Sequence, residues 1–448
     1  MKKHNIKMFP ARKKLLCALI GTSLLWNGTS AAWAAEASET PQSVEEQQAD
    51  AKKQNFELEE IIVTAEGYRL PPAYAGGQVA RGSRVGLLGN LDFLATPFNT
   101  TSYTAATVEN QQGQGLAGVL ALDPAVRDIT GTSYSPTWTI RGLSVGMADV
   151  GFNGLYGLIP YTNLGTEFVE RVEVHKGLSA LLNGIAPNGG SLGGSINLVP
   201  KRAGDEPVTR FTTTFSGESQ LGGHLDIGRR FGPDDRYGIR LNTSYSNGNT
   251  GVDGEKIKKA ATMLSFDMRA ARFRGSIDLG YQKVIENGPT TVLRLDNYAF
   301  VPKAPNSDFN FSAPWSRADN DLAFGVVKGE YDLNKDWQAY ASFGARESNY
   351  SNYQFGYAYL VNRQGDFNVR YENWPLRYTA HTEEAGVTGK FSTGELHHRL
   401  ALSASQFNVN RYENYPPQRI LGNMTNLYNP VWQDQLNFYP VANGKSLP

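Results

Sequence analysis

The chain has 448 residues, with 43 basic and 43 acidic side chains, and so carries no net formal charge at pH 7. A neutral balance gives no electrostatic reason to expect a nucleic-acid partner, which requires a basic surface. The single cysteine, Cys17, lies near the N-terminus, so the rest of the chain contains no thiol for a disulfide or a cysteine-based metal site.

Residues 1–34 have the three parts of a secretory signal peptide. A basic leader precedes an apolar run from Leu15 to Trp26, and small residues end in Ala32-Trp33-Ala34. The alternative is a membrane anchor, but the apolar run is shorter than the ~20 residues with which a helix spans a bilayer. We therefore expect export, with the peptide removed after Ala34.

A polar tail, residues 35–67, follows and ends in "EEIIVTAEG" (59–67). Its Glu, Gln, Ala and Ser residues have little to bury, which predicts disorder. Ile61, Ile62, Val63 and Thr64 are nevertheless four consecutive β-branched residues, which favour an extended backbone. Such a free segment can add as a strand to a sheet of another protein. The alternatives are a local hairpin or a membrane-facing strand.

Residues 68–206 have mixed α/β character. "QGLAGVLALDPAV" (114–126) has helical spacing before Pro124, and "EFVERVEVHKG" (167–177) predicts a strand. "ALLNGIAPNGGSLGGSINLVPKR" (180–202) predicts a short helix, a glycine-rich loop and another strand. We expect a compact α/β domain ahead of the remaining chain.

From residue 207 onward, apolar and polar residues alternate with period two. In "YGIRLNTSYSN", Ile239 and Leu241 share one face of a strand, and Arg240 and Asn242 share the other. The apolar face is the core of a soluble sandwich but the lipid face of an outer-membrane barrel. The predicted strands are 207–217, 223–232, 237–248, 260–270, 273–283, 321–332, 336–347, 381–392 and 397–409.

The connections between these strands separate the two alternatives. Tight turns such as "PDDR" and "LNKD" alternate with longer loops near 218–222, 249–259, 284–320 and 348–380. Short turns at one rim and long loops at the other are typical of outer-membrane barrels. Bacterial single-chain barrels have an even number of strands, whereas nine are predicted here. The polar ending "FYPVANGKSLP" is a poor membrane strand, so we expect a truncated barrel.

Several of these stretches together resemble one family. "EEIIVTA", "RDITGTSYSPTWTIRGL", "GLYGLIPY" and "EFVERVEVHKGLSALLNGIAPNGGSLGGSINLVPKR" are similar to the TonB box and plug of TonB-dependent outer-membrane receptors, nearest the ferric-siderophore group. The resemblance implies a 22-stranded antiparallel transmembrane β-barrel, of which about nine strands are present, closed by an α/β plug. It further implies a monomeric receptor that takes up a ferric siderophore through the outer membrane of a Gram-negative bacterium. This uptake would be driven by TonB with ExbB and ExbD.

The resemblance also assigns residues, with 68–206 as the plug and 207–448 as the first part of the barrel. Residues 60–65 would bind TonB, and two plug arginines, Arg141 and Arg171, would pair with barrel carboxylates beyond residue 448. Residues 35–58 are too short for an extra signalling domain. The predicted TonB-binding residues are Glu60, Ile61, Ile62, Val63, Thr64 and Ala65. The predicted ligand contacts are Tyr134, Met147, Tyr156 and Tyr161 on the plug and Tyr350, Tyr353, Phe355, Tyr357 and Tyr359 in a long loop.

Other motifs do not support an enzyme or a metal site. "GQGLAG" (113–118) lacks the preceding buried strand of a dinucleotide site, and "NGGSLGG" lacks the Lys-Ser/Thr of a phosphate loop. His397-His398 is interpreted as a solvated pair in a turn. We expect no cofactor and no metal ligands, because iron would arrive inside its chelator. The alternatives are a receptor for haem or cobalamin, a non-functional truncated fragment and, least favoured, a secreted hydrolase.

Overall fold

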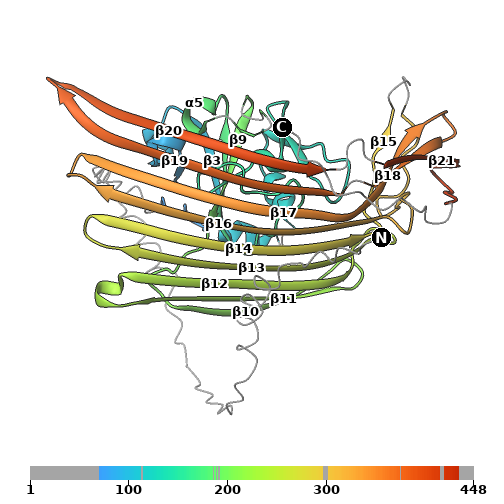
Figure 1. Ribbon diagram of the computed structural model, residues 1–448, viewed down its shortest axis with the longest axis horizontal. Coiled ribbons are helices and arrows are strands. Elements are labelled where there is room, and N and C mark those ends of the chain that lie inside the picture. The colour runs from blue at the N-terminus through green and yellow to red at the C-terminus, as the bar shows by residue number, and fades with distance from the viewer. Residues whose placement is uncertain are drawn as a thin grey trace, which may run out of the picture. The chain divides into compact units, whose positions relative to one another are not determined.

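The computed structural model describes residues 70–111, 115–184, 186–187, 189, 192–295, 301–373, 375–413 and 418–432 (Figure 1). These residues belong to one compact unit, Val63–Pro448. The predicted signal peptide and the segment 60–65 lie outside the described residues. Among the helices within them, none is long and apolar enough to cross a membrane.

Nine long strands form an antiparallel sheet in which each pairs with the next along the chain (Figure 1). All nine predicted strands are confirmed. They are β10 (Val208–Ser216), β11 (Gln220–Phe231), β12 (Tyr237–Asn249), β13 (Lys256–Arg269), β14 (Phe273–Asn287), β16 (Arg317–Asp332), β17 (Trp337–Leu360), β19 (Leu376–Thr393) and β20 (Leu396–Glu413).

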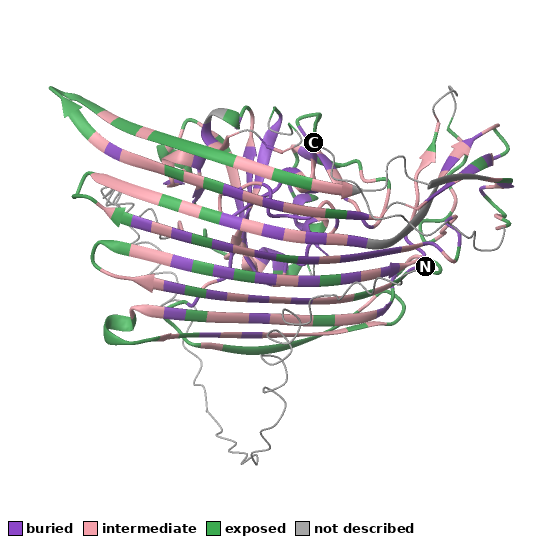
Figure 2. Ribbon diagram, in the orientation of Figure 1, coloured by how far each residue is buried: buried purple, intermediate pink, exposed green. Residues whose placement is uncertain are grey.

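The two faces of this sheet have the reverse of the usual burial pattern. On β14, the outward side chains of Ile277 and Leu279 are 40% and 52% exposed, whereas the inward Asp278 is fully buried. Ile277 pairs with Val327 of β16, so the apolar face continues across the strands. Figure 2 shows this alternation on β13, β14 and β16, whereas β10 is exposed along most of its length. Exposed apolar and buried polar residues fit a sheet with lipid outside and protein inside.

The connections alternate in length as predicted, except that the first one at the long-loop end, 217–219, is as short as the turns at the other end. The turns 232–236, 270–272, 333–336 and 394–395 lie at one end of the sheet, and the loops 217–219, 250–255, 288–316 and 361–375 lie at the other. Three strands at the long-loop end were not predicted: β15 (Leu293–Arg294), β18 (Asp366–Asn373) and β21 (Gln418–Asn426). β17 is also longer than predicted, since it continues to Leu360 and pairs there with β18 instead of β19.

The preceding α/β domain contains three small sheets. A four-stranded sheet has the order β3 (Asn99–Thr104), β8 (Val169–Lys176), β9 (Gly194–Pro200) and β7 (Gly151–Phe152). A second sheet joins β4 (Val126–Asp128), β5 (Thr137–Ile140) and β6 (Leu143–Gly146), and a hairpin joins β1 (Gly82–Arg84) to β2 (Asn90–Asp92). The predicted strands in 167–177 and 180–202 correspond to β8 and β9.

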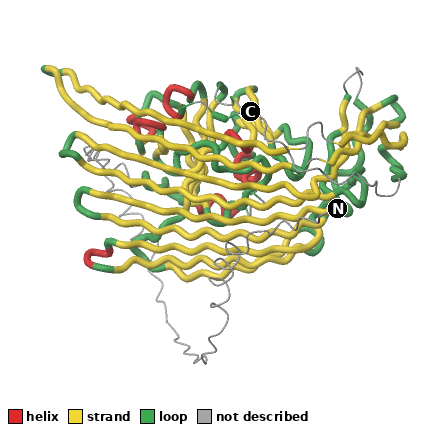
Figure 3. The backbone as a smooth tube through the Cα atoms, in the orientation of Figure 1, coloured by secondary structure: helices red, strands yellow, loops and turns green. Residues whose placement is uncertain are grey.

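Short helices complete this domain. They are α3 (Ala105–Asn110), α4 (Leu116–Leu120), α5 (Ala180–Asn183) and the 3-10 turns η1 (Gly86–Leu88), η2 (Phe93–Ala95) and η3 (Met147–Asp149). α4 confirms the helix expected before Pro124. Apart from η4 (Pro233–Asp235), in the turn between β11 and β12, all described helices belong to the α/β domain, as Figure 3 shows.

The α/β domain packs against the inner face of the large sheet through one continuous apolar core. Phe152 of β7 meets Phe324 of β16 edge-on, with 5.0 Å between the ring centroids. Inward side chains of β13 and β16, including Met263 and Leu322, join the same buried cluster. The inner face therefore contributes apolar side chains to this interface as well as the charged ones described next.

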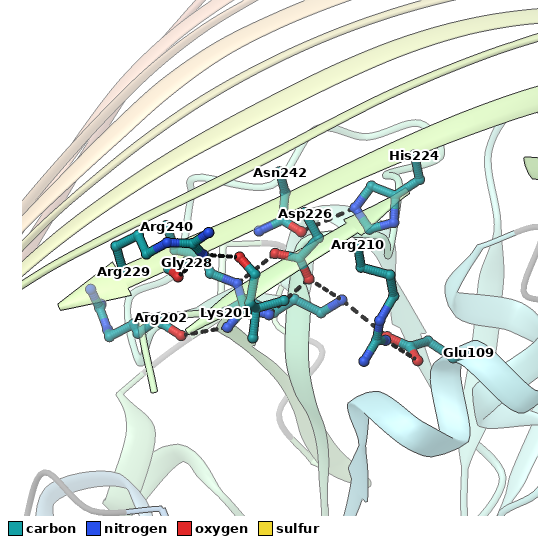
Figure 4. A network of polar contacts seen from close by, with 11 residues as sticks. Glu109, Lys201, Arg202, Arg210, His224, Asp226, Gly228, Arg229, Arg240 and Asn242 are labelled. Atoms are coloured by element: carbon teal, nitrogen blue, oxygen red, sulfur yellow. Dashed lines mark hydrogen bonds and ion pairs between the residues drawn. The ribbon is translucent and has the colours of Figure 1, made fainter. Parts of the chain in front are cut away.

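Ion pairs fix the same interface where β9 leads into β10 (Figure 4). Lys201 lies 3.3 Å from Glu109 of α3 and 3.6 Å from Asp226 of β11. Arg240 of β12 donates two hydrogen bonds to Asp226, of 2.5 and 2.7 Å. Arg202 donates to Asp278 at 2.7 Å. Glu109 is half exposed, but the other charged side chains are largely shielded from water, and these pairs hold the domain in one register on the sheet.

Candidate ligand-binding site

The loop between β4 and β5 reaches the long-loop end of the large sheet. Its Ser133 exchanges two hydrogen bonds with Thr290, with Ser133 N to Thr290 Oγ1 at 2.9 Å and Thr290 N to Ser133 Oγ at 3.1 Å. Gly131 lies so close to Val292 that an added Cβ would come within 2.4 Å of a Val292 methyl carbon. Tyr134 is the next large side chain in this loop, and it is buried.

A second segment, residues 157–163, runs along the wall toward the same end. Leu158 packs on Gly344, where a Cβ would lie 2.7 Å from a Leu158 methyl carbon. Arg346 donates to the carbonyl oxygen of Ile159, and the N–H of Tyr161 donates to the phenol oxygen of Tyr350 at 3.0 Å. Three residues of β17, namely Gly344, Arg346 and Tyr350, therefore hold this segment in place.

These two loops bring three of the predicted residues, Tyr134, Tyr161 and Tyr357, together with Ala318. Tyr134 and Ala318 form a buried pair, against which Tyr161 and Tyr357 pack. Tyr134 and Tyr161 come from the α/β domain, whereas Tyr357 comes from the upper part of β17. Tyr359 follows two residues later, on the same face of the strand. Residues far apart in sequence therefore meet at one aromatic cluster.

The β17–β18 hairpin has one packed face and one face turned toward this cluster. The packed face buries Ala358, Phe367, Val369 and Tyr371 in a separate apolar core. On the other face, Arg370 pairs with Tyr357 across the two strands. Its guanidinium carbon lies 5.2 Å from the ring centres of both Tyr357 and Tyr359. We call Tyr134, Tyr161, Tyr357, Tyr359 and Arg370 the apex site.

The other predicted ligand contacts lie elsewhere or outside the described side chains. Met147 is buried in the main apolar core, so its placement indicates packing. Tyr156 lies deeper in the domain, where burial raises its pKa to about 12. Tyr350 supports the apex site from behind, as the hydrogen-bond acceptor of Tyr161. The side chains of Tyr353 and Phe355 are outside the described set.

The two predicted plug arginines have different surroundings. Arg171 is buried and donates to the carbonyl oxygen of Pro71 at 3.2 Å, while its Nε and Nη1 have no hydrogen-bond partner among the described residues. Burial lowers its pKa. Arg141 is exposed and has a positive φ of 51°. Their pairing with barrel carboxylates stays a prediction. Ion pairs between the α/β domain and the large sheet are instead made by four residues of the domain that were not predicted, namely Lys201, Arg202, Glu109 and Glu167.

The described residues contain no group of three or more His, Cys, Asp or Glu side chains that could hold a metal ion. The small cavity lined by Tyr134, Glu286 and Tyr350 has room for about one water molecule. Chemically, the apex site offers aromatic faces, phenol hydroxyls and a guanidinium group. It suits a ligand that lies on these groups from the long-loop side.

Comparison with known proteins identifies the α/β domain. Residues 92–191 match the family model described as "TonB-dependent Receptor Plug Domain". The chain carries the plug domain of a TonB-dependent receptor. The long sheet that follows the plug corresponds to part of the antiparallel β-barrel of such receptors, a class of barrel in which short turns lie at the periplasmic end and longer loops at the extracellular end.

Individual relatives extend the match beyond the plug. The chain is 36% identical over 437 residues to the ferrichrome receptor FcuA of Yersinia enterocolitica, covering 93% of this chain and 56% of the relative. The structure of BauA, the ferric preacinetobactin receptor of Acinetobacter baumannii, is 33% identical with a TM-score of 0.76, covering 82% of this chain and 56% of that chain. The chain therefore spans about half the length of the relatives that it matches.

A more distant structure shares the fold alone. The pyoverdine outer membrane receptor FpvA of Pseudomonas aeruginosa PAO1 is 15% identical, with a TM-score of 0.70, over 86% of this chain and 57% of that chain. Plug and barrel wall thus keep their arrangement across widely different sequences.

Proposed function

We propose that the protein is an outer-membrane receptor that binds a ferric siderophore at the apex site and takes it up with energy supplied through TonB. The observation that carries this proposal is the meeting of Tyr134 and Tyr161 from the plug with Tyr357 from the barrel. A ligand on this cluster would contact both parts of the receptor at once. Two relatives are named as receptors for ferrichrome and for ferric preacinetobactin, which supports a ferric siderophore as the ligand.

The chemistry of the site suits an iron complex that stays inside its chelator. Tyrosine rings provide contact area at a small entropic cost, and their hydroxyl groups can bond to the oxygen atoms of a chelator. The iron would be cargo that stays bound to its chelator, so the proposal requires no metal ligands from the protein. No reaction is proposed at this site.

The energy would enter through residues 60–65, from Glu60 to Ala65. This segment would add as a strand to TonB, whose partners are ExbB and ExbD, and the polar tail would give it reach. The signal peptide would export the chain, and the receptor would lie in the outer membrane of a Gram-negative bacterium, where we expect a monomer in contact with lipid. The alternative ligands are haem and cobalamin, which could also lie on an aromatic surface.

Growth on defined iron sources tests the proposal. The gene that encodes this chain is expressed in an iron-starved host without other siderophore receptors, and purified ferric siderophores are supplied one at a time. We expect at least one siderophore to restore growth, and a TonB-deficient host to remain without growth. Rescue by haem or cobalamin alone would assign the alternative ligand, and rescue without TonB would indicate a simple pore.

A further inference from the structure

A segment of the plug, residues 159–167, crosses the inner face of the wall and is held by an inward side chain of each strand that it passes. Its contacts come, in chain order, from β17, β16, β14 and β13, which are neighbours in the sheet. They are Arg346 with the carbonyl oxygen of Ile159, Tyr350 with the N–H of Tyr161, Asn320 with the hydroxyl of Thr162, Gln282 with Asn163 and Gly165, and Lys259 with Glu167. We call residues 159–167 the strap.

Gln282 of β14 contacts the backbone of the strap at two residues. Its side chain is 2% exposed. Oε1 accepts a hydrogen bond from the N–H of Gly165 at 2.7 Å, and Nε2 donates to the carbonyl oxygen of Asn163 at 2.8 Å. A side-chain amide can donate and accept at once, as a backbone peptide does. One side chain therefore fixes both the position and the direction of the strap.

The fit between Gln282 and the strap leaves little space at Gly165. A Cβ added to Gly165 would lie 3.3 Å from Oε1 of Gln282 and 2.4 Å from Oε2 of Glu167. Glycine thus allows the strap backbone to come close to the wall. Because this contact is buried, removal of the Gln282 amide would leave the N–H of Gly165 without an acceptor.

Asn163 connects the strap to the other plug loop of the apex site. Its N–H donates to the carbonyl oxygen of Tyr134 at 3.1 Å, and its side-chain amide donates to the carbonyl oxygen of Ser133. The hydroxyl of Ser135 donates to the carbonyl oxygen of Tyr161 at 3.2 Å. The loop 131–135 and the strap are therefore bonded into one unit, which Gln282 holds at Asn163.

From these contacts we propose that Gln282 is a positioning residue of the apex site: it sets the height of both plug tyrosines, Tyr134 and Tyr161, relative to the barrel residue Tyr359. The inference rests on the proposed function for its effect on ligand binding. Gln282 is buried beneath the strap, so it would affect affinity only through the tyrosines that it positions.

Amide hydrogen exchange, measured on the protein in lipid nanodiscs, tests the positioning without a ligand. Gln282→Met keeps an unbranched side chain of similar length but cannot bond with the strap. We expect the amides of 131–135 and 159–165 to exchange at least tenfold faster, while those of β8 keep their rates. Gln338→Met is the matched control, because Gln338 donates to Asp332 at 3.1 Å at the turn end of the wall. It should leave both loops unchanged.

Equilibrium binding to membrane vesicles tests the effect on the ligand. The probes are ferrichrome, ferric citrate and a ferric tricatecholate. Gln282→Met should weaken the tightest of them roughly tenfold, the equivalent of one to two hydrogen bonds. Most of this loss should disappear in a Tyr161→Ala background, where a side chain that Gln282 positions is already absent. It should persist in a Tyr359→Ala background, because Tyr359 belongs to the barrel.

Two results would overturn the role of Gln282. One is unchanged exchange in either plug loop of Gln282→Met. The other is an equal loss of affinity in the Tyr161→Ala and Tyr359→Ala backgrounds, which would indicate a general structural effect. If none of the probes binds the original protein, the proposed function is contradicted, and the exchange rates still decide whether Gln282 holds the two loops.

Discussion

The phenol oxygen of Tyr350, on barrel strand β17, accepts a hydrogen bond from the N–H of Tyr161 on the plug, with 3.0 Å between the two atoms. The rings of these residues also meet edge-on, with 5.8 Å between their centroids. The barrel wall therefore fixes the height at which the plug presents a tyrosine to a ligand.

Removing that acceptor should lower affinity without unfolding the receptor. Tyr350→Phe keeps the ring contact but removes the phenol oxygen that accepts the hydrogen bond from the part-buried Tyr161 N–H. We expect roughly fivefold weaker siderophore binding, from the ~1 kcal/mol that one hydrogen bond contributes. Titration of the ligand into membrane vesicles measures the change. Tyr331→Phe, on the lipid face, is the matched control, and equal affinities of the two variants would remove the positioning role of Tyr350.

The second prediction concerns Ile62 and the coupling to TonB. Ile62→Pro removes a backbone donor and fixes φ, which should prevent strand addition to TonB. Uptake of radioactive ferric siderophore should fall to the level of a TonB-deficient host, while surface binding stays unchanged. Ile62→Val keeps the β-branched backbone and should transport normally. Normal uptake by the proline variant would show that residues 60–65 do not bind TonB.

The third prediction concerns the ion pair between Glu167 of the plug and Lys259 of β13, whose charged atoms lie 2.5 Å apart. Burial would raise the pKa of Glu167, but the ammonium group of Lys259 more than offsets it, and the pKa is lowered. A lowered pKa stabilises the folded plug above the unfolded value, near 4.3, and this contribution disappears as the pH falls further.

Glu167→Gln should therefore destabilise the plug at pH 7 by roughly 1–2 kcal/mol, less than a fully buried pair because both side chains retain some exposure. At pH 3 the variant and the original protein should unfold at similar temperatures. Calorimetry of the plug transition at the two pH values measures this difference. Glu206→Gln, at an exposed position, serves as the control, and a pH-independent effect would exclude the charge as its cause.

The fourth prediction tests which face of the sheet meets lipid. Leu279 is half exposed on the outward face of β14, near the middle of its apolar stretch. Leu279→Arg should cost about 2–4 kcal/mol of barrel stability if that position lies in the bilayer midplane. Urea titration of folding in lipid vesicles gives the value. Leu279→Val should cost less than ~1.5 kcal/mol, and an arginine tolerated as well as valine would place this face in water.

The long strands could be predicted from sequence because lipid and lumen impose opposite demands on alternate residues. Two neighbouring residues show this requirement: Leu279 is apolar and faces outward, whereas Asp278 is charged and faces inward. The hairpin of β17 and β18 was not predicted because its strands extend beyond the apolar belt. Beyond the belt, alternate residues no longer face lipid on one side and protein on the other. "YAYL" and "FNVRYE" alternate as well, but both of their faces contact protein or solvent.

The apex site could be predicted only in part. The aromatic residues of the plug and the long loop were recognised by type, yet their sequence does not show which of them meet. Met147 and Tyr134 are both large residues in the same region, but one packs into the core and the other reaches the apex because of the path of the loop between β4 and β5. Arg370 was not predicted, because its role depends on strand pairing with Tyr357.

β17 is one uninterrupted strand from Trp337 to Leu360, which pairs first with β19 and then with β18. The same backbone thus carries Tyr350 behind the plug and Tyr357 above it. Where the partner changes, between Ser351 and Gln354, the register of β17 with β16 also shifts. The wall therefore holds Tyr350 in register behind the plug, whereas the hairpin that carries Tyr357 and Arg370 joins the wall at an irregular position, and adjustment to ligands of different size would fall to this hairpin.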